Sequence, residues 1–129
     1  MAVSGGVVES YKDGGLVITC KVASAVTAGQ LVVLTANSFE VDVAGAAAVK
    51  KCGVALRSAS AVGDKIPVAF PGAQVYKLTA TGAIDTGQYV QSAAAGTVAP
   101  IAADGDPRLI QGFALEDIAN AASGRVAIL

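Results

Sequence analysis

The chain carries one pattern of residues twice. From Val17 it reads V-I-T-C-K-V-A-S-A-V-T-A-G-Q-L-V, and from Val75 it reads V-Y-K-L-T-A-T-G-A-I-D-T-G-Q-Y-V, at a constant offset of 58. The string G-V-A-L from Gly53 matches G-F-A-L from Gly112 after one inserted residue. A unit of about 57 residues is long for a solenoid repeat, and two copies are too few for one. The duplication predicts a single domain over 16–129, with lobe one at 16–70, lobe two at 71–129, and 1–15 as an N-terminal arm.

Short runs of alternating apolar and polar residues predict strands in both lobes. Turn formers separate the runs, and fifteen glycines disfavour long helices. Only the segment 116–122, E-D-I-A-N-A-A, has the composition of a short helix. The sequence therefore predicts an all-β fold, a small β-barrel built from two similar β-rich lobes, with one short helix and an extended arm. The strands expected are 16–22, 31–35, 39–43, 49–57, 65–70, 74–79, 89–92, 98–101, 109–115 and 125–129. The strand over 49–57 is broken at Gly53, where we expect a bulge or a close approach of the backbone.

Composition restricts the classes of partner. The formal net charge is −1, and the nine basic residues are scattered, whereas nucleic-acid binding needs a clustered basic face. No run approaches the roughly 18 apolar residues of a membrane span, and the N-terminus lacks the features of a signal peptide. We therefore expect no nucleic acid, no membrane and no secretion. Cys20 and Cys52 are expected as buried thiols rather than a disulfide.

Residues for catalysis or metal binding are nearly missing. The chain has no histidine, which removes the usual general base and the usual nucleophilic triads, and two cysteines alone cannot hold zinc. Asp85-Thr86-Gly87 resembles the motif of dimeric aspartic proteases, but Thr27-Ala28-Gly29 occupies the same place in the first copy, so the position requires a turn and not an acid. Asp104-Gly105-Asp106 lacks the other ligands of a calcium loop. We expect no catalytic residue, no metal site and no cofactor.

The paired strings T-A-G-Q-L-V, C-G-V-A-L and V-G-D-K-I-P-V-A-F, with D-T-G-Q-Y-V, Q-G-F-A-L and G-R-V-A-I-L, resemble the small capsid decoration (cement) proteins of tailed bacteriophages. The resemblance covers about 16–129 at the level of pattern. It implies a β-tulip or β-barrel domain that sits on the outer capsid surface of the virion, commonly as a homotrimer. It also implies synthesis in the cytoplasm of a bacterial host, and an N-terminal arm that reaches the major capsid protein.

The arm itself has the character of a segment that adds a strand to a partner. Glycines at 5, 6, 14 and 15 flank a short β-prone stretch, and its apolar side chains are candidate capsid contacts. The alternative is a terminus without a role. The candidate residues are Val3, Val7, Val8 and Tyr11.

These features together predict a non-enzymatic structural virion protein that cements neighbouring major capsid subunits and so stabilises the head. The alternative from another class is a small carbohydrate- or ligand-binding β-module of a phage fibre or adhesin. That alternative predicts a concave cluster of aromatic side chains, for which the chain offers three tyrosines and three phenylalanines.

Overall fold

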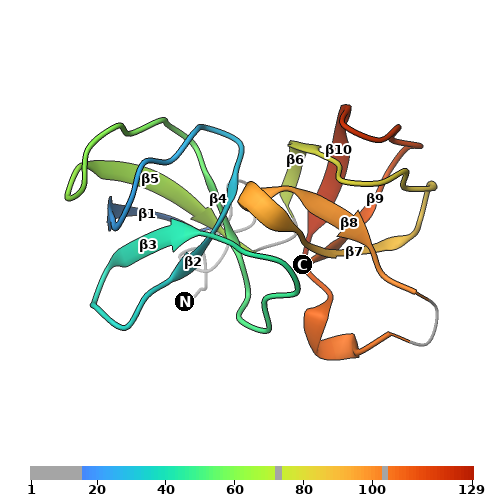
Figure 1. The fold of residues 1–129 in the computed structure, drawn as a ribbon, viewed down its shortest axis with the longest axis horizontal. Coiled ribbons are helices and arrows are strands. Elements are labelled where there is room, and N and C mark those ends of the chain that lie inside the picture. Colours follow the sequence, from blue (N-terminus) through green and yellow to red (C-terminus); the bar gives the residue numbers. More distant parts are fainter. Residues whose placement is uncertain (1–15, 72–73, 103–104) are drawn as a thin grey trace, which may run out of the picture.

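Ten strands in two sheets make up the part of the chain that the computed structural model describes, residues 16–71, 74–102 and 105–129 (Figure 1). Two single-turn 3-10 helices accompany them, η1 (Ala94–Gly96) and η2 (Pro107–Leu109). The predicted all-β class is confirmed. The strands are β1 (Leu16–Val22), β2 (Leu31–Leu34), β3 (Glu40–Val43), β4 (Gly53–Ala55), β5 (Lys65–Phe70), β6 (Gln74–Thr79), β7 (Tyr89–Ser92), β8 (Val98–Pro100), β9 (Gly112–Ala114) and β10 (Ser123–Ile128).

The first sheet is a closed barrel in the order β1-β3-β2-β4-β5, whereas the barrel predicted from the sequence was built from both copies. Antiparallel pairing joins its strands except where β1 runs parallel to β3 at Lys21 and Val22. Alternation along each strand sends one set of side chains inward, because successive residues point to opposite faces. The barrel interior is filled by Cys20, Val22, Val26, Val32, Val41, Ala55, Ala59, Ile66 and Val68.

The second sheet, in the order β6-β10-β9-β7-β8, repeats the registers of the first. Ile18 pairs with Val68 in the first sheet, and Tyr76 pairs with Val126 in the second. Tyr76 lies 58 residues after Ile18, and Val126 lies 58 residues after Val68. An isolated parallel bridge between Ala80 and Val98 stands where β1 meets β3 in the barrel. The division of the chain into an arm and one duplicated domain stays a prediction, since 1–15 lie outside the described residues.

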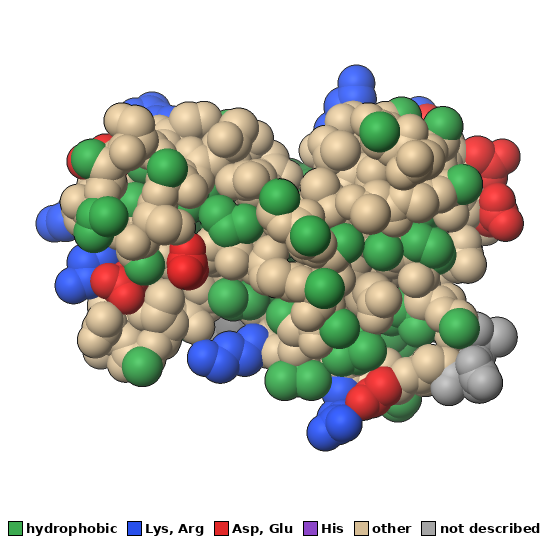
Figure 2. All heavy atoms as spheres, in the orientation of Figure 1, with side chains coloured by type: hydrophobic (Ala, Val, Ile, Leu, Met, Phe, Trp, Pro, Cys, Tyr) green, Lys and Arg blue, Asp and Glu red, His purple; other side chains and the backbone are tan. Residues whose placement is uncertain are grey.

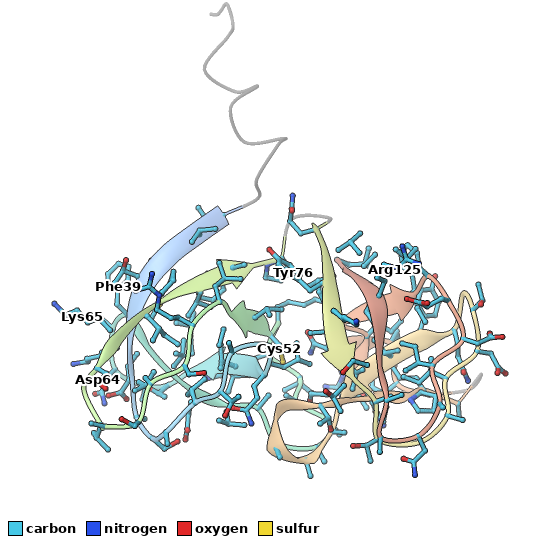
Figure 3. The ribbon with its side chains drawn as sticks, turned by 90° about the horizontal axis from the view of Figure 1, so that it is seen from above. Phe39, Cys52, Asp64, Lys65, Tyr76 and Arg125 are labelled. Carbon is cyan, nitrogen blue, oxygen red and sulfur yellow. The ribbon has the colours of Figure 1, made fainter. Side chains whose placement is uncertain are left out.

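One hydrophobic cluster runs across both sheets. Leu31, Cys52 and Val54 from the first sheet pack with residues of the second, and Figure 3 places Cys52 between the two. The second sheet contributes Leu78, Ala80, Ile84, Val90, Val98, Ala114, Ile118, Val126 and Ile128. Because each sheet leaves one apolar face that the other covers, burial on this scale stabilises the two as one body.

A buried side chain ties the two sheets together by hydrogen bonds. Gln111 is fully buried, and its Oε1 accepts from the N–H of Cys52 at 2.9 Å. Its Nε2 donates to the carbonyls of Lys50 at 2.9 Å and Ala48 at 3.2 Å. A buried amide is tolerated only when its groups are paired, and here they are. The link therefore fixes one arrangement of the sheets.

The short helix predicted over 116–122 is wrong. Ile118 instead forms an antiparallel bridge with Ile84, in which each N–H donates to the other's carbonyl at 2.8 Å. The carboxylate of Asp117 accepts from the backbone N–H and the hydroxyl of Thr86 at 2.8 Å. These bonds lower the pKa of Asp117, the backbone bond from Thr86 contributing most. Tertiary pairing uses the backbone groups that a helix would need, and so overrides composition.

The start of β3 differs from the prediction, and the packing at Gly53 agrees with it. The strand predicted over 39–43 begins at Glu40, because Phe39 adopts a left-handed φ of 54° that no strand permits. The predicted close approach at Gly53 is confirmed, since a Cβ there would lie 2.7 Å from Val68 Cγ1 and 3.0 Å from the carbonyl oxygen of Ala69.

Candidate functional site

The candidate capsid contacts Val3, Val7, Val8 and Tyr11 lie outside the described residues, so the structure brings none of them to a site. What it does describe is the point where the arm joins the barrel, at Leu16. From Leu16 to Cys20, β1 pairs with β5 on one side, while β3 pairs only with the last two residues of β1. Within the described part of the chain, the beginning of β1 is therefore a sheet edge open on one side.

An apolar groove of about 490 Å³ lies beside this open edge. Leu16 and Ile18 of β1 line it together with Phe70 of β5, Leu34 of β2 and Phe39 of the β2–β3 turn. Among all the residues lining the groove, Ser38 supplies the only hydroxyl. Such a surface suits contact with apolar side chains of another protein more than recognition of a polar small molecule.

The β2–β3 turn holds Phe39 out toward solvent. Its side chain is 63% exposed, and Figure 3 shows it outside the barrel, at the end remote from the second sheet. The carboxylate of Glu40 accepts from the Thr35 hydroxyl at 2.6 Å and from the Asn37 amide at 3.0 Å. These bonds, Thr35 first, lower the pKa of Glu40. A left-handed φ is unfavourable for a bulky residue and marks a conformation that the surrounding bonds enforce.

A second opening, of about 440 Å³, lies on the second sheet. Tyr89 of β7, which is 53% exposed, lines it with Gln88, Ile101 and Ala102. Residues of the 105–110 loop complete the lining. This opening is also mainly apolar in character.

The position of Asp85 is that of a turn residue. Its N–H donates to Gln88 Oε1 at 3.0 Å, just as the N–H of Thr27 donates to Gln30 Oε1 at 2.8 Å in the first copy. The carboxylate takes no part in this repeated bond, and the equivalent residue in the first copy is a threonine. The geometry therefore gives Asp85 no role that an acid alone could fill.

Charged side chains are sparse and lie at the surface. On the face in Figure 2 they lie mostly toward the margins, while hydrophobic side chains gather over the centre and over the second sheet. Arg108 pairs with Asp106 at 2.7 Å and Arg125 pairs with Glu116 at 3.0 Å, and the hydrogen bonds from each arginine lower the pKa of its partner carboxyl. Exposed pairs of this kind contribute little to stability.

The described residues hold no cluster of three acidic or cysteine side chains of the kind that binds a metal ion. Asp106, from the string that resembled a calcium loop, accepts from the N–H of Arg108 and is the N-cap of η2. Asp104 lies outside the described residues. In the part of the chain that the structure covers, no helix is long and apolar enough to span a bilayer.

Both cysteines are buried and unpaired, as expected. Cys20 lies in the barrel interior and Cys52 between the sheets. Burial raises the pKa of Cys20 and raises that of Cys52 to about 11, so both thiols stay protonated and unreactive near neutral pH.

Sequence reasoning missed three exposed apolar residues that line the two openings: Leu34, Phe39 and Tyr89. It assigned each of them to a strand. Comparison of the two copies held a signal for the third, because Tyr89 stands where the first copy has Leu31. A tyrosine can meet water with its hydroxyl, whereas a buried leucine cannot.

The fold and its surface thus define a small all-β protein with apolar openings, a sparse charge and no cluster of catalytic or metal-binding groups among the described residues. The profile of the phage cement protein family matches residues 10–129. The chain therefore belongs to the phage cement protein family, and the resemblance seen in the sequence is confirmed. It is a structural protein of a bacteriophage virion, associated with the capsid.

A solved structure has a similar fold. The head fiber gp8.5 N base in bacteriophage phi29 superposes with a TM-score of 0.70 over 88% of this chain and 93% of that chain, at 21% sequence identity. At this identity the likeness concerns the fold alone. No curated protein matches the chain.

Proposed function

We propose that this protein is a non-enzymatic decoration protein that binds the outer surface of a phage head as a homotrimer and cements neighbouring major capsid subunits. Membership of the phage cement protein family is the observation that carries the proposal. Synthesis in the cytoplasm of the bacterial host follows from this role. The N-terminal arm is the proposed capsid contact, through Val3, Val7, Val8 and Tyr11.

The open edge at the start of β1 supports an arm that acts by strand addition. β1 begins there in an extended conformation, and the exposed Leu16 and Val17 continue the apolar character of the arm's sequence. A peptide that adds to the edge of a partner's sheet gains backbone hydrogen bonds regardless of most side chains. An arm rooted in an existing strand is already aligned for this kind of contact.

Energetics favour a multivalent arrangement. Ordering each residue costs about 1–2 kcal/mol in backbone entropy, so fifteen ordered residues offset much of what one arm gains on binding. Three arms on one trimer bind with a high effective concentration, because the first contact holds the others near their sites. The proposed trimer would therefore bind the capsid far more tightly than a single chain.

The alternative of a carbohydrate- or ligand-binding module has less support. The groove brings two aromatic side chains together, Phe39 and Phe70. However, a site for a sugar needs several convergent polar groups, and the lining offers only the hydroxyl of Ser38 among oxygen-bearing side chains. An apolar contact with protein fits this lining better.

The test is to delete residues 1–14 and to measure co-sedimentation of both forms with undecorated heads. We expect the shortened protein to stay folded, to keep its oligomeric state and to lose capsid binding. Val8→Pro should weaken binding by a smaller factor, because it removes one backbone donor and restricts the chain. Val62→Ala is the matched control, since Val62 is 76% exposed and lies on the β4–β5 turn, whose Gly63 bonds to Val22 at the far end of β1 from Leu16.

A thermal scan of decorated heads provides the second measurement. A protein that binds only the intact lattice should raise the temperature at which heads release DNA, by mass action. The full-length chain should do so and the shortened chain should not. Equal binding by both forms would contradict the role of the arm, and no binding by the full-length chain would contradict the proposed function.

A further inference from the structure

The two sheets meet within one chain through a specific contact. The turn between β7 and β8, carrying Ala95 and Gly96, lies against Gln30, Leu31 and Ala44 of the barrel. Gln30 Nε2 donates to the carbonyl of Ala95 at 3.0 Å, and the N–H of Gly96 donates to the carbonyl of Ala44 at 3.0 Å. The packing leaves no room for a side chain, since a Cβ on Gly96 would lie 2.8 Å from Gln30 Cβ.

The second sheet has the same receiving face. Leu31 pairs with Val54 as Tyr89 pairs with Phe113, one repeat further along. The carbonyl of Leu31 accepts from Ala44, and the carbonyl of Tyr89 accepts from Ile101, at 2.9 and 3.0 Å. The counterparts of Leu31 and Ala44 are therefore Tyr89 and Ile101.

In the second sheet no described segment docks on this face. Leu31 is fully buried at the contact between the sheets, where its backbone lies against Gly96, whereas Tyr89 is 53% exposed. Tyr89, Ile101 and Gln88 line the opening of about 440 Å³ on this sheet. Gln30 Nε2 donates to the turn of the second sheet at Ala95. Nε2 of its counterpart Gln88 has no hydrogen-bond partner among the described residues.

The barrel carries a turn equivalent to the one that docks. The N–H of Thr35 donates to the carbonyl of Glu40 as that of Ala93 donates to the carbonyl of Thr97, so Phe39 corresponds to Gly96. Both residues have a left-handed φ, 54° and 71°. This turn makes no such contact within its own chain, and its Leu34 and Phe39 side chains are 43% and 63% exposed.

The turn without an intramolecular contact and the open face differ in a matched way from the contact inside the chain. At that contact, a glycine lies against the barrel with no space for a side chain. At the open face, a cavity is present, and the corresponding turn carries a phenylalanine in place of the glycine. The cavity is lined by Tyr89, Ile101, Pro107 and Ile110, which suit an aromatic ring.

We propose that the opening on the second sheet receives the Leu34–Phe39 turn of a second copy of this chain. The ring of Phe39 fills the cavity, and Gln88 Nε2 donates to the backbone of the turn. The turn and the face are the counterparts of those that meet at Gly96, but the turn lies further from the sheet, because a Cβ in the place of Gly96 would lie 2.8 Å from Gln30 Cβ and 2.9 Å from the carbonyl oxygen of Leu31.

This contact joins different surfaces of the two copies. The β2–β3 turn lies toward one end of the long axis and the 105–110 loop toward the other (Figure 1). Head-to-tail contacts build a ring when the rotation closes. Three copies joined in this way would place six sheets around one axis. The contact between the turn and the opening would then be the interface of the proposed homotrimer. The inference rests on the proposed function only for the number of copies.

The first test is the mass of the purified full-length chain by sedimentation equilibrium. We expect three times the 12.6 kDa of one chain. Phe39→Gly should raise the protein concentration at which half of the trimer dissociates by at least about tenfold. The reason is that the opening loses the one aromatic side chain that it buries. Because glycine favours a left-handed φ, this variant should melt no lower than the wild type as a monomer. Ala102→Arg should have the same effect from the opposite surface, and Val62→Ala should have none.

Cross-linking distinguishes this arrangement from other interfaces. The double variant Ser38→Cys with Ala102→Cys should form disulfide-linked dimers and trimers on oxidation, while either single variant should not. Native Cys20 and Cys52 are buried and do not compete. Dimers from a single variant, a trimer unaffected by Phe39→Gly, or a wild-type monomer would each overturn the proposal. Capsid binding is measured separately, so a chain that trimerises as described but ignores heads would refute only the proposed function.

Discussion

Replacement of Gln111 by leucine should destabilise the protein by about 3 kcal/mol. Leucine has nearly the volume of glutamine, so the change removes hydrogen bonds without opening a large cavity. The buried N–H of Cys52 loses its acceptor, and an orphaned buried donor costs about 1–3 kcal/mol. The carbonyls of Lys50 and Ala48 lose donors but lie nearer to solvent, at a cost of about 0.5–1.5 kcal/mol each.

The assay is urea unfolding followed by circular dichroism, with the free energy of unfolding extrapolated to water. Because natural domains have free energies of unfolding of only about 5–15 kcal/mol, a loss of this size is easily measured. Gln91→Ala is the matched control, a partly exposed glutamine on β7 that makes no side-chain hydrogen bond within the described residues.

The same experiment tests whether the sheets unfold together. Since Gln111 links them across a shared core, we expect one transition in the wild type. A loss below about 1 kcal/mol in Gln111→Leu would refute the reasoning, because it would mean that water or a shift of the backbone replaces all three bonds. Two separate transitions in the wild type would refute the coupling of the sheets.

Two further predictions concern a glycine and a carboxylate. Gly112→Ala should cost at least about 2 kcal/mol in urea unfolding, because the new Cβ would overlap the carbonyl oxygen of Ala127, whereas Gly45→Ala, with open space around it, should be neutral. The pKa of Glu40 is lowered, so its ionised form stabilises the folded state at pH values above the ordinary pKa of a glutamate. This contribution is lost as the pH falls below about 4. Glu40→Gln should therefore lose less stability than the wild type between neutral and acid pH, and equal losses would refute that contribution.

The strands were largely predictable from local sequence. Alternation in 16–22 and 74–79 gave strands with the observed bounds, and glycine at position 53 indicated the close approach of β4 to β5. The duplicated strings also indicated equivalent positions, which the strand registers of the two sheets match. These features depend on neighbours within a few residues, so the sequence carries them directly.

The segment 116–122 shows where local reasoning ends. Its composition favours a helix, yet Ile118 pairs with Ile84, a partner 34 residues away. Phe39 fits an alternating strand, yet bonds around Glu40 hold it in a turn. In both places the backbone obeys contacts that no window of the sequence contains.

The sequence by itself determined the all-β class, the lack of histidine chemistry and the family to which the chain belongs. Tertiary structure alone decided that the two copies are used differently. Leu31 is buried because it lies at the contact between the two sheets, and Tyr89 is exposed because no described segment docks at the same place. Two similar units joined head to tail always leave one receiving face and one turn unmatched, and only the packed chain shows which ones they are.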